Sequence, residues 1–558
     1  MEDFKKDIDP SKITDVGELR EVVLLLLNVI EEQSVLLKSQ KEEIQQLRDE
    51  INRLKGEKGK PDFKPKKEPD AALGTNDVDG DKDKRGNHKT GADKDRVQVD
   101  RIVELIDTGL ELPADAVIKS WEERTVQDIV LRRDTVLYRI AVWYSPSEHQ
   151  TYKSVFPLSG QGSFGPQIRG LLHLLHYECD VTQGRLESFC ESLGLSVSGG
   201  SIDNILKSHA EEAVAERKGI LSAGIANSGY VQADSTGGKE KGVSLYTQIF
   251  CSPLFTAYFS NPTKSRQQVL QSLCGLTEAK DLPVIMNADT LRLLGQFKVP
   301  KTYQEALACF WDMGECTSLG ELQTWIKEEL PELACQKNTF TRALDAFALA
   351  HYLQRDDFPT LSALMSDDAP EYKLISPLHS LCWIHDARDY KKLAPIMDIY
   401  RQQLQSLMDD YWKFYKSLLE YKGADAATRT LTKPGIEAEF ERVFTRITGY
   451  GALDKLIART FSKKTEMLHV LNRPDLPLHN NAAELAARRK VRKRDVSLHT
   501  MSAEGTRVQD AYLSIIETAK KLGISAYEYI TDFVAHNKKM TPLAKIIESK
   551  KLQEALEF

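Results

Sequence analysis

The chain has 558 residues, of which 41% are hydrophobic and 28% charged, and its formal net charge is −7. This composition is close to the average of soluble proteins, so it excludes collagen, a wholly disordered chain and a membrane transporter. The longest apolar run, Val22 to Leu27, is much shorter than the roughly 20 residues of a spanning helix, and the opening residues MEDFKKDIDP lack the apolar core of a secretory signal. We expect a cytoplasmic protein of about three or four domains, with no membrane partner.

Cysteine spacing and charge constrain the partners less strongly. The eight cysteines include no Cys-x-x-Cys pair, whereas zinc knuckles and disulfide frameworks need closer or more regular spacing. We therefore expect free, mostly buried thiols and no zinc. The negative net charge is only a weak argument against a DNA partner, because an average over several domains hides local patches.

Residues 1–55 carry a heptad pattern that predicts a coiled coil. Its a and d positions are Leu19, Val23, Leu26, Ile30, Gln33, Leu37, Gln40, Ile44, Leu47, Ile51 and Leu54. This spacing predicts a homo-oligomer formed through residues 19–54; the alternative is a helix folded back on its own chain. Residues 56–98 are rich in both charges and contain one aromatic residue, so they predict a disordered linker.

The next two segments predict a small sheet and a DNA-binding motif. Three β-rich runs, TVQDIVLR, TVLYRIAVWYS and TYKSVFPL, indicate a small β-rich domain over residues 99–165. In residues 166–225, the short helices TQGRLESFCESLG and SIDNILKSHAEEA flank a glycine-bearing turn, which is typical of a helix-turn-helix. A plain helical pair is the alternative. In the helix-turn-helix interpretation, the second helix presents Ser201, Asn204 and Lys207 to DNA.

Residues 226–535 alternate strand and helix patterns, and residues 536–558 predict a helical tail. Within this region we expect a helical insertion at about residues 290–356. Three acids stand out: Asp234 ends the strand YVQAD, Asp367 follows the strand TLSALMS, and Glu484 begins a helix. Strand-end carboxylates and one from a later helix can converge on a pair of divalent ions, and their hard oxygen ligands suit Mg²⁺ or Mn²⁺.

Each acid also has a structural interpretation. Asp234 fits a turn with the residues that follow it, and Asp367 with its neighbour Asp368 fits a helix cap. Glu484 lies three residues after Asn481, which is the spacing of a capping box. Asp289, after LPVIMNA, is a rival strand-end acid. The residues alone leave these alternatives open.

Four ordered blocks resemble bacterial insertion-sequence transposases of the IS66 family. They are SFGPQIRGLLHLLHYECDVTQGRLESFCESLGLSVSGGSI, YVQADSTG, SDDAPEYKLISPLHSLCWIHDARDYKKL and LPLHNNAAELAARRKVRKRDVSLHTMSAEGTRVQDAYLSIIETAKKLGISAYEYI. The resemblance implies an α+β, mostly helical fold with an RNase H-like catalytic core. It implies an Asp-Asp-Glu triad at Asp234, Asp367 and Glu484, with Asp368 as the rival for the second place and Asp289 set aside.

The resemblance also implies a function. It predicts a metal-dependent transposase that cleaves DNA and transfers the strand, with two Mg²⁺ or Mn²⁺ ions per site, acting on transposon ends and target DNA with possible accessory proteins of the element. A DNA-binding regulator with an inactive or unused core is the alternative. Two departures from the family matter: no cysteine motif precedes the helix-turn-helix, so zinc is not implied, and His479 stands where many members have Asp.

Further residues are expected around the site. Asn480 and Asn481 are predicted to cap the helix or position Glu484, and His385 is a neighbouring candidate, with core packing as the alternative. A dense basic run follows Glu484 and predicts contacts with DNA phosphates, with a solvated helix face as the alternative. It consists of Arg488, Arg489, Lys490, Arg492, Lys493 and Arg494.

Overall fold

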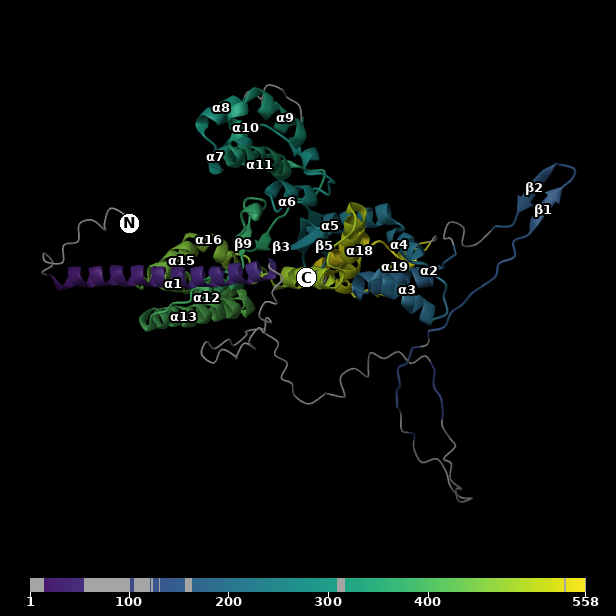
Figure 1. Cartoon of the computed structure of the whole chain (residues 1–558), viewed down its shortest axis with the longest axis horizontal. Coiled ribbons are helices and arrows are strands. Elements are labelled where there is room, and N and C mark those ends of the chain that lie inside the picture. The colour runs from purple at the N-terminus through teal and green to yellow at the C-terminus, as the bar shows by residue number, and fades with distance from the viewer. Residues whose placement is uncertain are drawn as a thin grey trace, which may run out of the picture. The chain divides into compact units, whose positions relative to one another are not determined.

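A computed structural model describes residues 15–54, 101–104, 121, 124–129, 131–155, 163–308, 317–535 and 538–556. The predicted linker at 56–98 lies outside these residues. The described part is mostly helical with one larger sheet (Figure 1), which confirms an α+β, mostly helical fold. It contains no helix that is both long and apolar enough to cross a membrane.

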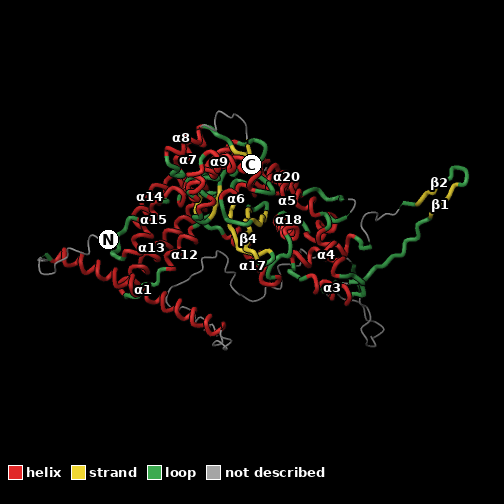
Figure 2. The backbone as a smooth tube through the Cα atoms, turned by 45° about the horizontal axis from the view of Figure 1, so that its top comes forward, coloured by secondary structure: helices red, strands yellow, loops and turns green. Residues whose placement is uncertain are grey.

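A five-stranded mixed sheet forms the centre of the fold. Its strands are β3 (Val231–Glu240), β4 (Val243–Cys251), β5 (Thr256–Asn261), β8 (Leu364–Ser366) and β9 (His379–Leu381). The spatial order is β5-β4-β3-β8-β9, with β3, β4 and β5 antiparallel and β8 and β9 running parallel to β3. Figure 2 shows these strands enclosed by helices. The central strand, β3, therefore joins the antiparallel half to the parallel half.

The two faces of the sheet follow from the alternation of side chains along each strand. Ala233 lies opposite Phe250 in the β3–β4 ladder, and both belong to the main hydrophobic core. Asp234 lies opposite Ile249, and Ile249 lies opposite Tyr258 in the β4–β5 ladder. Ile249 and Tyr258 pack in a separate cluster with alanines of helix α17 (Asn481–Ser497). Asp234 therefore shares the sheet face that α17 covers.

The sheet is surrounded by helix α5 (Ala210–Asn227) and by helices that follow it in the chain. They are α6 (Arg266–Leu273), α17, α18 (Ala503–Lys521), α19 (Ala526–Phe533) and α20 (Leu543–Leu556). α18 and α5 pack on β5, and α17 packs on β3 and β4. The buried Asp510 carboxylate on α18 accepts the Ser260 backbone N–H at 2.7 Å and the Ser260 hydroxyl at 3.1 Å. The edge of β5 is thus hydrogen-bonded to a helix side chain that also pairs with Lys490 of α17.

A first helical insertion lies between β5 and β8. It contains η5 (Ala279–Asp281), β6 (Pro283–Val284), α7 (Ala288–Gln296), α8 (Lys301–Ala308), β7 (Thr317–Ser318), α9 (Leu319–Glu329), α10 (Pro331–Cys335) and α11 (Lys337–Gln354). Helices therefore occupy the region, about 290–356, where the sequence predicts them. A buried ion pair of 2.6 Å between Arg266 of α6 and Asp345 of α11 ties the insertion to the core. The 3-10 turn η7 (Pro370–Tyr372) then connects β8 to β9.

A second helical segment, which we call the helical lobe, spans residues 383–471 between β9 and α17. It contains α12 (Trp383–Lys392), α13 (Asp398–Gly423), α14 (Ala426–Phe444), α15 (Gly451–Ser462), α16 (Lys464–Met467) and η8 (His469–Leu471). The lobe has its own aromatic core, in which Trp383 packs against Tyr411, Phe414 and Phe440. The sequence predicts helices here but not a separate core.

The long helix α1 (Val16–Leu54) lies along the helical lobe (Figure 1). The Asn28 amide donates to the Gly449 carbonyl at 2.8 Å and accepts the Gly451 N–H at 2.8 Å. The Glu31 carboxylate, almost fully buried, accepts the N–H groups of Ile396 and Met397 just before α13. The alternative of a helix folded back on its own chain therefore describes one face of α1.

The heptad seam occupies a different face of α1. Seven of its members are exposed in the described side chains: Leu19, Val23, Leu26, Ile30, Leu37, Ile44 and Leu47. The docked face instead contains Asn28 and Glu31, with Leu27 packed against the lobe core. The predicted oligomer through residues 19–54 stays a prediction, and the docking leaves its seam accessible.

The region before the core differs from the predicted small sheet. Among the described residues of 99–165, the strands are β1 (Val142–Ser145) and β2 (Gln150–Lys153), which pair as one hairpin. The described residues from 124 to 141 contain no strand, so the run TVQDIVLR does not pair. The apolar side chains of this run are exposed, for example Val126 and Ile129. An alternating apolar pattern forms a strand only where a neighbouring strand or face is present to pack against. The run TVQDIVLR has no such partner among the described residues.

The predicted helix-turn-helix segment is a helical pair in the structure. α2 (Pro166–His173) and the π-helical turn η4 (Leu174–Glu178) precede α3 (Gln183–Ser192) and α4 (Gly199–Lys207). The bend contains Gly194 at φ +72, a left-handed conformation that glycine adopts without a steric penalty. The Ser198 hydroxyl caps α4 by accepting the Ser201 N–H at 3.2 Å. DNA recognition by this pair stays a prediction.

The docking of α1 can be tested at Glu31. Replacing Glu31 by Ala removes the acceptor for two backbone N–H groups, so we expect a loss of about 1–2 kcal/mol in the docking of α1. Hydrogen exchange at Ile396 and Met397 should accelerate about tenfold, since 1.4 kcal/mol corresponds to a factor of ten. The exposed neighbour Glu32→Ala is the matched control and should leave both amides protected. Equal exchange in the two variants would contradict the docked arrangement.

Candidate active site

The register of the parallel strands brings two of the predicted acids together. Val231 pairs with Leu364 and Gln232 with Met365, an offset of 133 residues. The same offset places Asp234 beside Asp367, since 234 + 133 = 367. Asp367 directly follows β8, whereas Asp234 is the fourth residue of β3, which continues to Glu240. The prediction that Asp234 ends its strand is therefore wrong, although the register still places the two acids side by side. The sequence prediction that these two acids converge therefore agrees with the sheet.

The Asp234 carboxylate is half-buried beside other negative charges. Burial, followed by the charges of Asp367 and Glu484, raises its pKa to about 6. The Ser235 backbone N–H donates to it at 2.7 Å, which partly opposes that rise. Among the described residues, neither Asp234 nor Asp367 has an ion-pair partner within 4.0 Å. A cation placed between the two acids would therefore meet carboxylates that no lysine or arginine side chain neutralises.

The structure separates Asp367 from its rival Asp368. The Asp367 side chain is half-buried and accepts the Ala369 N–H at 3.3 Å. Asp368 is exposed and pairs with Lys463 and, at 3.3 Å, with Lys373. Of these two acids, it is Asp367 whose charge raises the pKa of Asp234. The geometry favours Asp367 as the second acid of the site.

Glu484 enters the site from the first turn of α17, and Asn480 fixes where that helix begins. Asn480 is fully buried, and its side-chain NH₂ donates to the Ala233 carbonyl at 2.7 Å. Its backbone N–H donates to the Cys382 sulfur at 3.2 Å. The start of α17 is thereby held beside β3, one residue before Asp234. These contacts are of the kind that a positioning role for Asn480 requires, and that role stays a prediction, whereas Asn481 is exposed.

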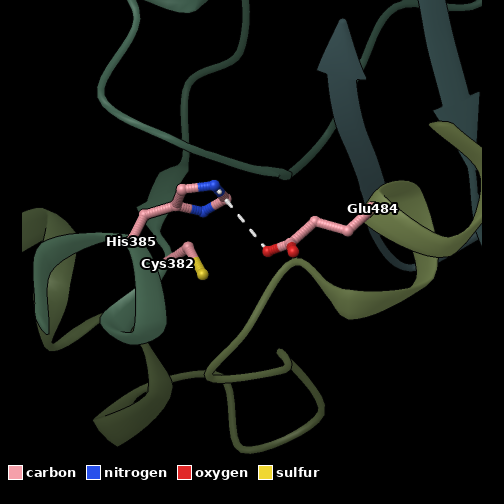
Figure 3. A group of neighbouring side chains, drawn as sticks. All are labelled: Cys382, His385 and Glu484. Carbon is pink, nitrogen blue, oxygen red and sulfur yellow. Dashed lines mark ion pairs between the residues drawn. The ribbon is translucent and has the colours of Figure 1, made fainter. Parts of the chain in front are cut away.

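The Glu484 carboxylate is turned towards α12. Arg388 donates to its two oxygens at 3.3 and 2.9 Å, and His385 Nε2 lies 3.7 Å from Oε1 (Figure 3). Within the described chain, the close group of potential ligands around Glu484 is Cys382, His385 and Glu484, whose atoms lie within 4.8 Å of one another. The three predicted acids do not form such a close group there. This differs from the predicted triad, because Arg388 holds the Glu484 side chain.

The chemistry of Cys382 does not suit a thiolate site. Burial raises the pKa of its thiol to about 11, and the sulfur accepts a backbone N–H from Asn480. A metal ligand must be the thiolate, and the neighbouring guanidinium of Arg388 lies against the other two members of the group. The carboxylates Asp234, Asp367 and Glu484 are therefore the better donors, with hard oxygens that suit Mg²⁺ or Mn²⁺.

Most of the predicted basic run points into the protein. Arg489 pairs with Asp180 at 2.9 Å, and Lys490 pairs with Asp510. Lys493 is buried, donates to the His176 carbonyl at 2.6 Å, and has its pKa lowered to about 8 by that burial. Arg494 donates to the Gly237 carbonyl at 2.6 Å.

Arg488 and Arg492 are the exposed residues of the run, and the side chain of Arg494 is 39% exposed although it is bonded to β3. The prediction that all six basic residues contact phosphates therefore needs correction, because four of them join α17 to the sheet, to α18 and to the α2–α3 region. Glu484, Arg488 and Arg492 are spaced four residues apart and share one face of α17. The two exposed arginines thus follow the predicted catalytic acid along the same face of α17.

The predicted DNA contacts of α4 also differ in availability. Asn204 is exposed, while Ser201 is half-buried and hydrogen-bonded to Ser198. Lys207 pairs with Asp203 one helical turn earlier, at 2.6 Å. Asn204 is thus the most accessible of the three candidates.

The sequence does not single out Arg388. It lies in WIHDARDY, where the pattern indicates only a helix with mixed charges, and no spacing links it to Glu484. The neighbouring His385 is a predicted candidate, and its Nε2 atom lies 3.1 Å from Arg388 Nη1. The signal for Arg388 is tertiary, since 96 residues separate it from its partner.

Two known proteins or families are similar to parts of this chain. The chain is 29% identical over 336 residues to an uncharacterised protein, y4jO, of Sinorhizobium fredii; the alignment covers 59% of this chain and 100% of that protein. The family described as "Transposase IS66 family" matches residues 336–508, a segment that includes Asp367, Arg388 and Glu484 but not Asp234. The match confirms the resemblance seen in the sequence over residues 336–508.

Proposed function

We propose that this chain is an active transposase that cleaves DNA and transfers the strand by metal-dependent phosphoryl transfer. The observation that carries the proposal is the register that places Asp234 beside Asp367 on adjacent parallel strands, under the helix α17 that carries Glu484. The electrostatic coupling of Asp234 to both other acids supports a single site. The match of residues 336–508 to a transposase family supports the reaction class.

The residues present fit divalent cations. All three acids offer hard oxygen ligands, and the buried Asn480 Oδ1 atom nearby has no hydrogen-bond partner. When bound there, two Mg²⁺ or Mn²⁺ ions would activate the attacking oxygen and stabilise the leaving oxygen of the phosphodiester. Asp234 would hold the ions from within β3, Asp367 from the end of β8, and Glu484 would complete the ligand set from α17.

The protein's own residues would hold the reacting DNA at this centre. The contacts of Asn480 hold the start of α17 beside β3, and Glu484 lies in the first turn of that helix. Arg488 and Arg492 follow it at steps of about 6 Å along the helix axis, which places two exposed guanidiniums beside the acids. Such phosphate contacts position a strand without reading its sequence.

The central sheet supports the expected RNase H-like core. The first acid lies on the central strand and the second directly after its parallel neighbour, as the family resemblance implies. A DNA-binding regulator with an unused core is the competing proposal. The presence of all three acids, two of them without a cationic partner, favours the enzyme.

We further propose that the free seam of α1 binds a second copy of the chain. Its a positions are mostly Val or Ile and its d positions mostly Leu, a combination that favours parallel two-stranded coils. In such a coil Asp15 at a g position faces Arg20 at an e position of the other copy, which pairs opposite charges. The docked face of α1 stays on the helical lobe, so both contacts are compatible.

The identity of the acids is tested by cleavage of element-end DNA. Asp234→Asn and Asp367→Asn should abolish Mg²⁺-dependent cleavage while DNA binding persists, because the lost charge removes metal ligands. Asp368→Asn is the matched control and should retain cleavage, since that side chain pairs with lysines outside the site. Full activity of Asp234→Asn would remove it from the centre, and an inactive Asp368→Asn with an active Asp367→Asn would reverse their assignment.

The DNA contacts of α17 are tested by salt-dependent binding. The double variant Arg488→Gln, Arg492→Gln should weaken DNA binding and lower the slope of log affinity against log salt by about 2, since each phosphate contact contributes about 0.9. Arg489→Gln removes a charge of the same helix that pairs internally, so it should lower thermal stability and leave the slope unchanged. An unchanged slope in the double variant would mean that neither arginine contacts DNA and that both only form a solvated helix face.

The oligomer is tested by one substitution in the seam. Leu26→Asp places a charge at an exposed d position, so light scattering should show a fall from dimer to monomer mass. Glu32→Gln on the same helix, outside the seam, is the control and should leave the mass unchanged. A wild-type mass equal to one chain would exclude the proposed coil.

A further inference from the structure

The Arg388 side chain occupies the position of a cation at Glu484. Its guanidinium donates to both carboxylate oxygens, at 3.3 and 2.9 Å, in the fork arrangement that arginine forms with carboxylates. The same nitrogen that binds Oε1 lies 3.1 Å from His385 Nε2. Both oxygens of the predicted third metal ligand are therefore already hydrogen-bonded within the protein.

Glu484 is the exception among the three acids. Asp234 and Asp367 accept only backbone N–H groups in the hydrogen bonds of the described chain, at 2.7 and 3.3 Å. Neither has an ion-pair partner there. A divalent cation can therefore reach the carboxylates of Asp234 and Asp367 without displacing a basic side chain. Ligation by Glu484 instead requires its oxygens to leave Arg388.

The two sides of this ion pair differ in freedom to move. The helix starts that carry them are fixed to each other, because the Trp383 N–H donates to the Leu478 carbonyl at 3.0 Å. The side chain of Glu484 is 15% exposed and that of Arg388 is 45% exposed. The guanidinium can therefore swing into water from a fixed helix, while the carboxylate stays enclosed near Asp234.

We propose that Arg388 is an internal counter-ion that competes with a divalent cation for Glu484, and that its release accompanies metal binding. The proposal rests on the proposed function, because it takes Asp234, Asp367 and Glu484 as the ligands. In the metal-free protein, Arg388 offsets one of three neighbouring negative charges. A divalent cation brings two positive charges to the same carboxylates and replaces it. Arg388 is a positioning residue in this exchange.

The exchange predicts the sign of a metal-affinity change. Arg388→Ala removes the competitor, so Mn²⁺ should bind the full-length protein about tenfold more tightly, which corresponds to about 1.4 kcal/mol. Isothermal titration calorimetry with MnCl₂ and no DNA measures this without any activity assay. If Arg388 instead served to aim Glu484 at the metal, the same substitution would weaken Mn²⁺ binding.

Three further variants define the outcome. Arg388→Lys keeps the charge but loses the fork, so its affinity should lie between wild type and Arg388→Ala. Lys392→Gln removes an exposed charge from the same helix and should leave the affinity unchanged. In a Glu484→Gln background, Arg388→Ala should no longer tighten Mn²⁺ binding, since the two residues act on one another.

The results separate this proposal from the proposed function. One outcome is that Asp234→Asn weakens Mn²⁺ binding, while Arg388→Ala binds Mn²⁺ as tightly as wild type or less tightly. The counter-ion role is then overturned and the metal site stands. If Asp234→Asn leaves Mn²⁺ binding unaltered, the metal site itself fails. Tighter binding in Arg388→Ala that disappears with Glu484→Gln supports both.

Discussion

The buried amide of Asn480 is the contact on which the site depends. Its side chain reaches the Ala233 carbonyl, 247 residues earlier, and its backbone N–H reaches the Cys382 sulfur, 98 residues earlier. One residue therefore joins the central strand, the start of the helical lobe and the start of α17. Since a buried polar group without its hydrogen bonds is costly, these three segments are constrained to meet. The acids of the site lie within four residues of that junction in β3 and α17.

The sequence is informative about the acids because their positions are local. An acid within or after an apolar strand pattern can be recognised from neighbouring residues, and parallel pairing then places Asp234 beside Asp367. What the sequence did not show is that β3 continues beyond Asp234 to Glu240. The same reasoning fails for the basic run. Arg489 and Lys490 look like solvated charges along the chain, but their partners Asp180 and Asp510 come from distant segments. The sequence cannot show that a charge is paired when its partner is set by the fold.

The helix α1 shows the same division between local and tertiary information. Its heptad seam is periodic, so the sequence reveals it, and the structure leaves that seam exposed. Its docked face depends on Asn28 and Glu31, which have no periodic signal and look like ordinary surface residues. Their partners are backbone groups around Gly449 and Ile396 in the helical lobe. The separate aromatic core of that lobe was equally invisible, because helical periodicity does not show which helices share a core.

The distribution of charge along α17 links the two ligands that the protein is proposed to bind. Glu484 and its neighbouring acids repel a phosphodiester, while Arg488 and Arg492 one and two turns further attract it. Neutralising the acids with a cation removes the repulsion and leaves the attraction, so metal and DNA should each favour binding of the other, by the reciprocity of linked equilibria. The net charge of −7 conceals this arrangement because it averages over the whole chain. What matters for DNA is the order of charges on one helix face, which begins with a carboxylate and continues with two exposed guanidiniums.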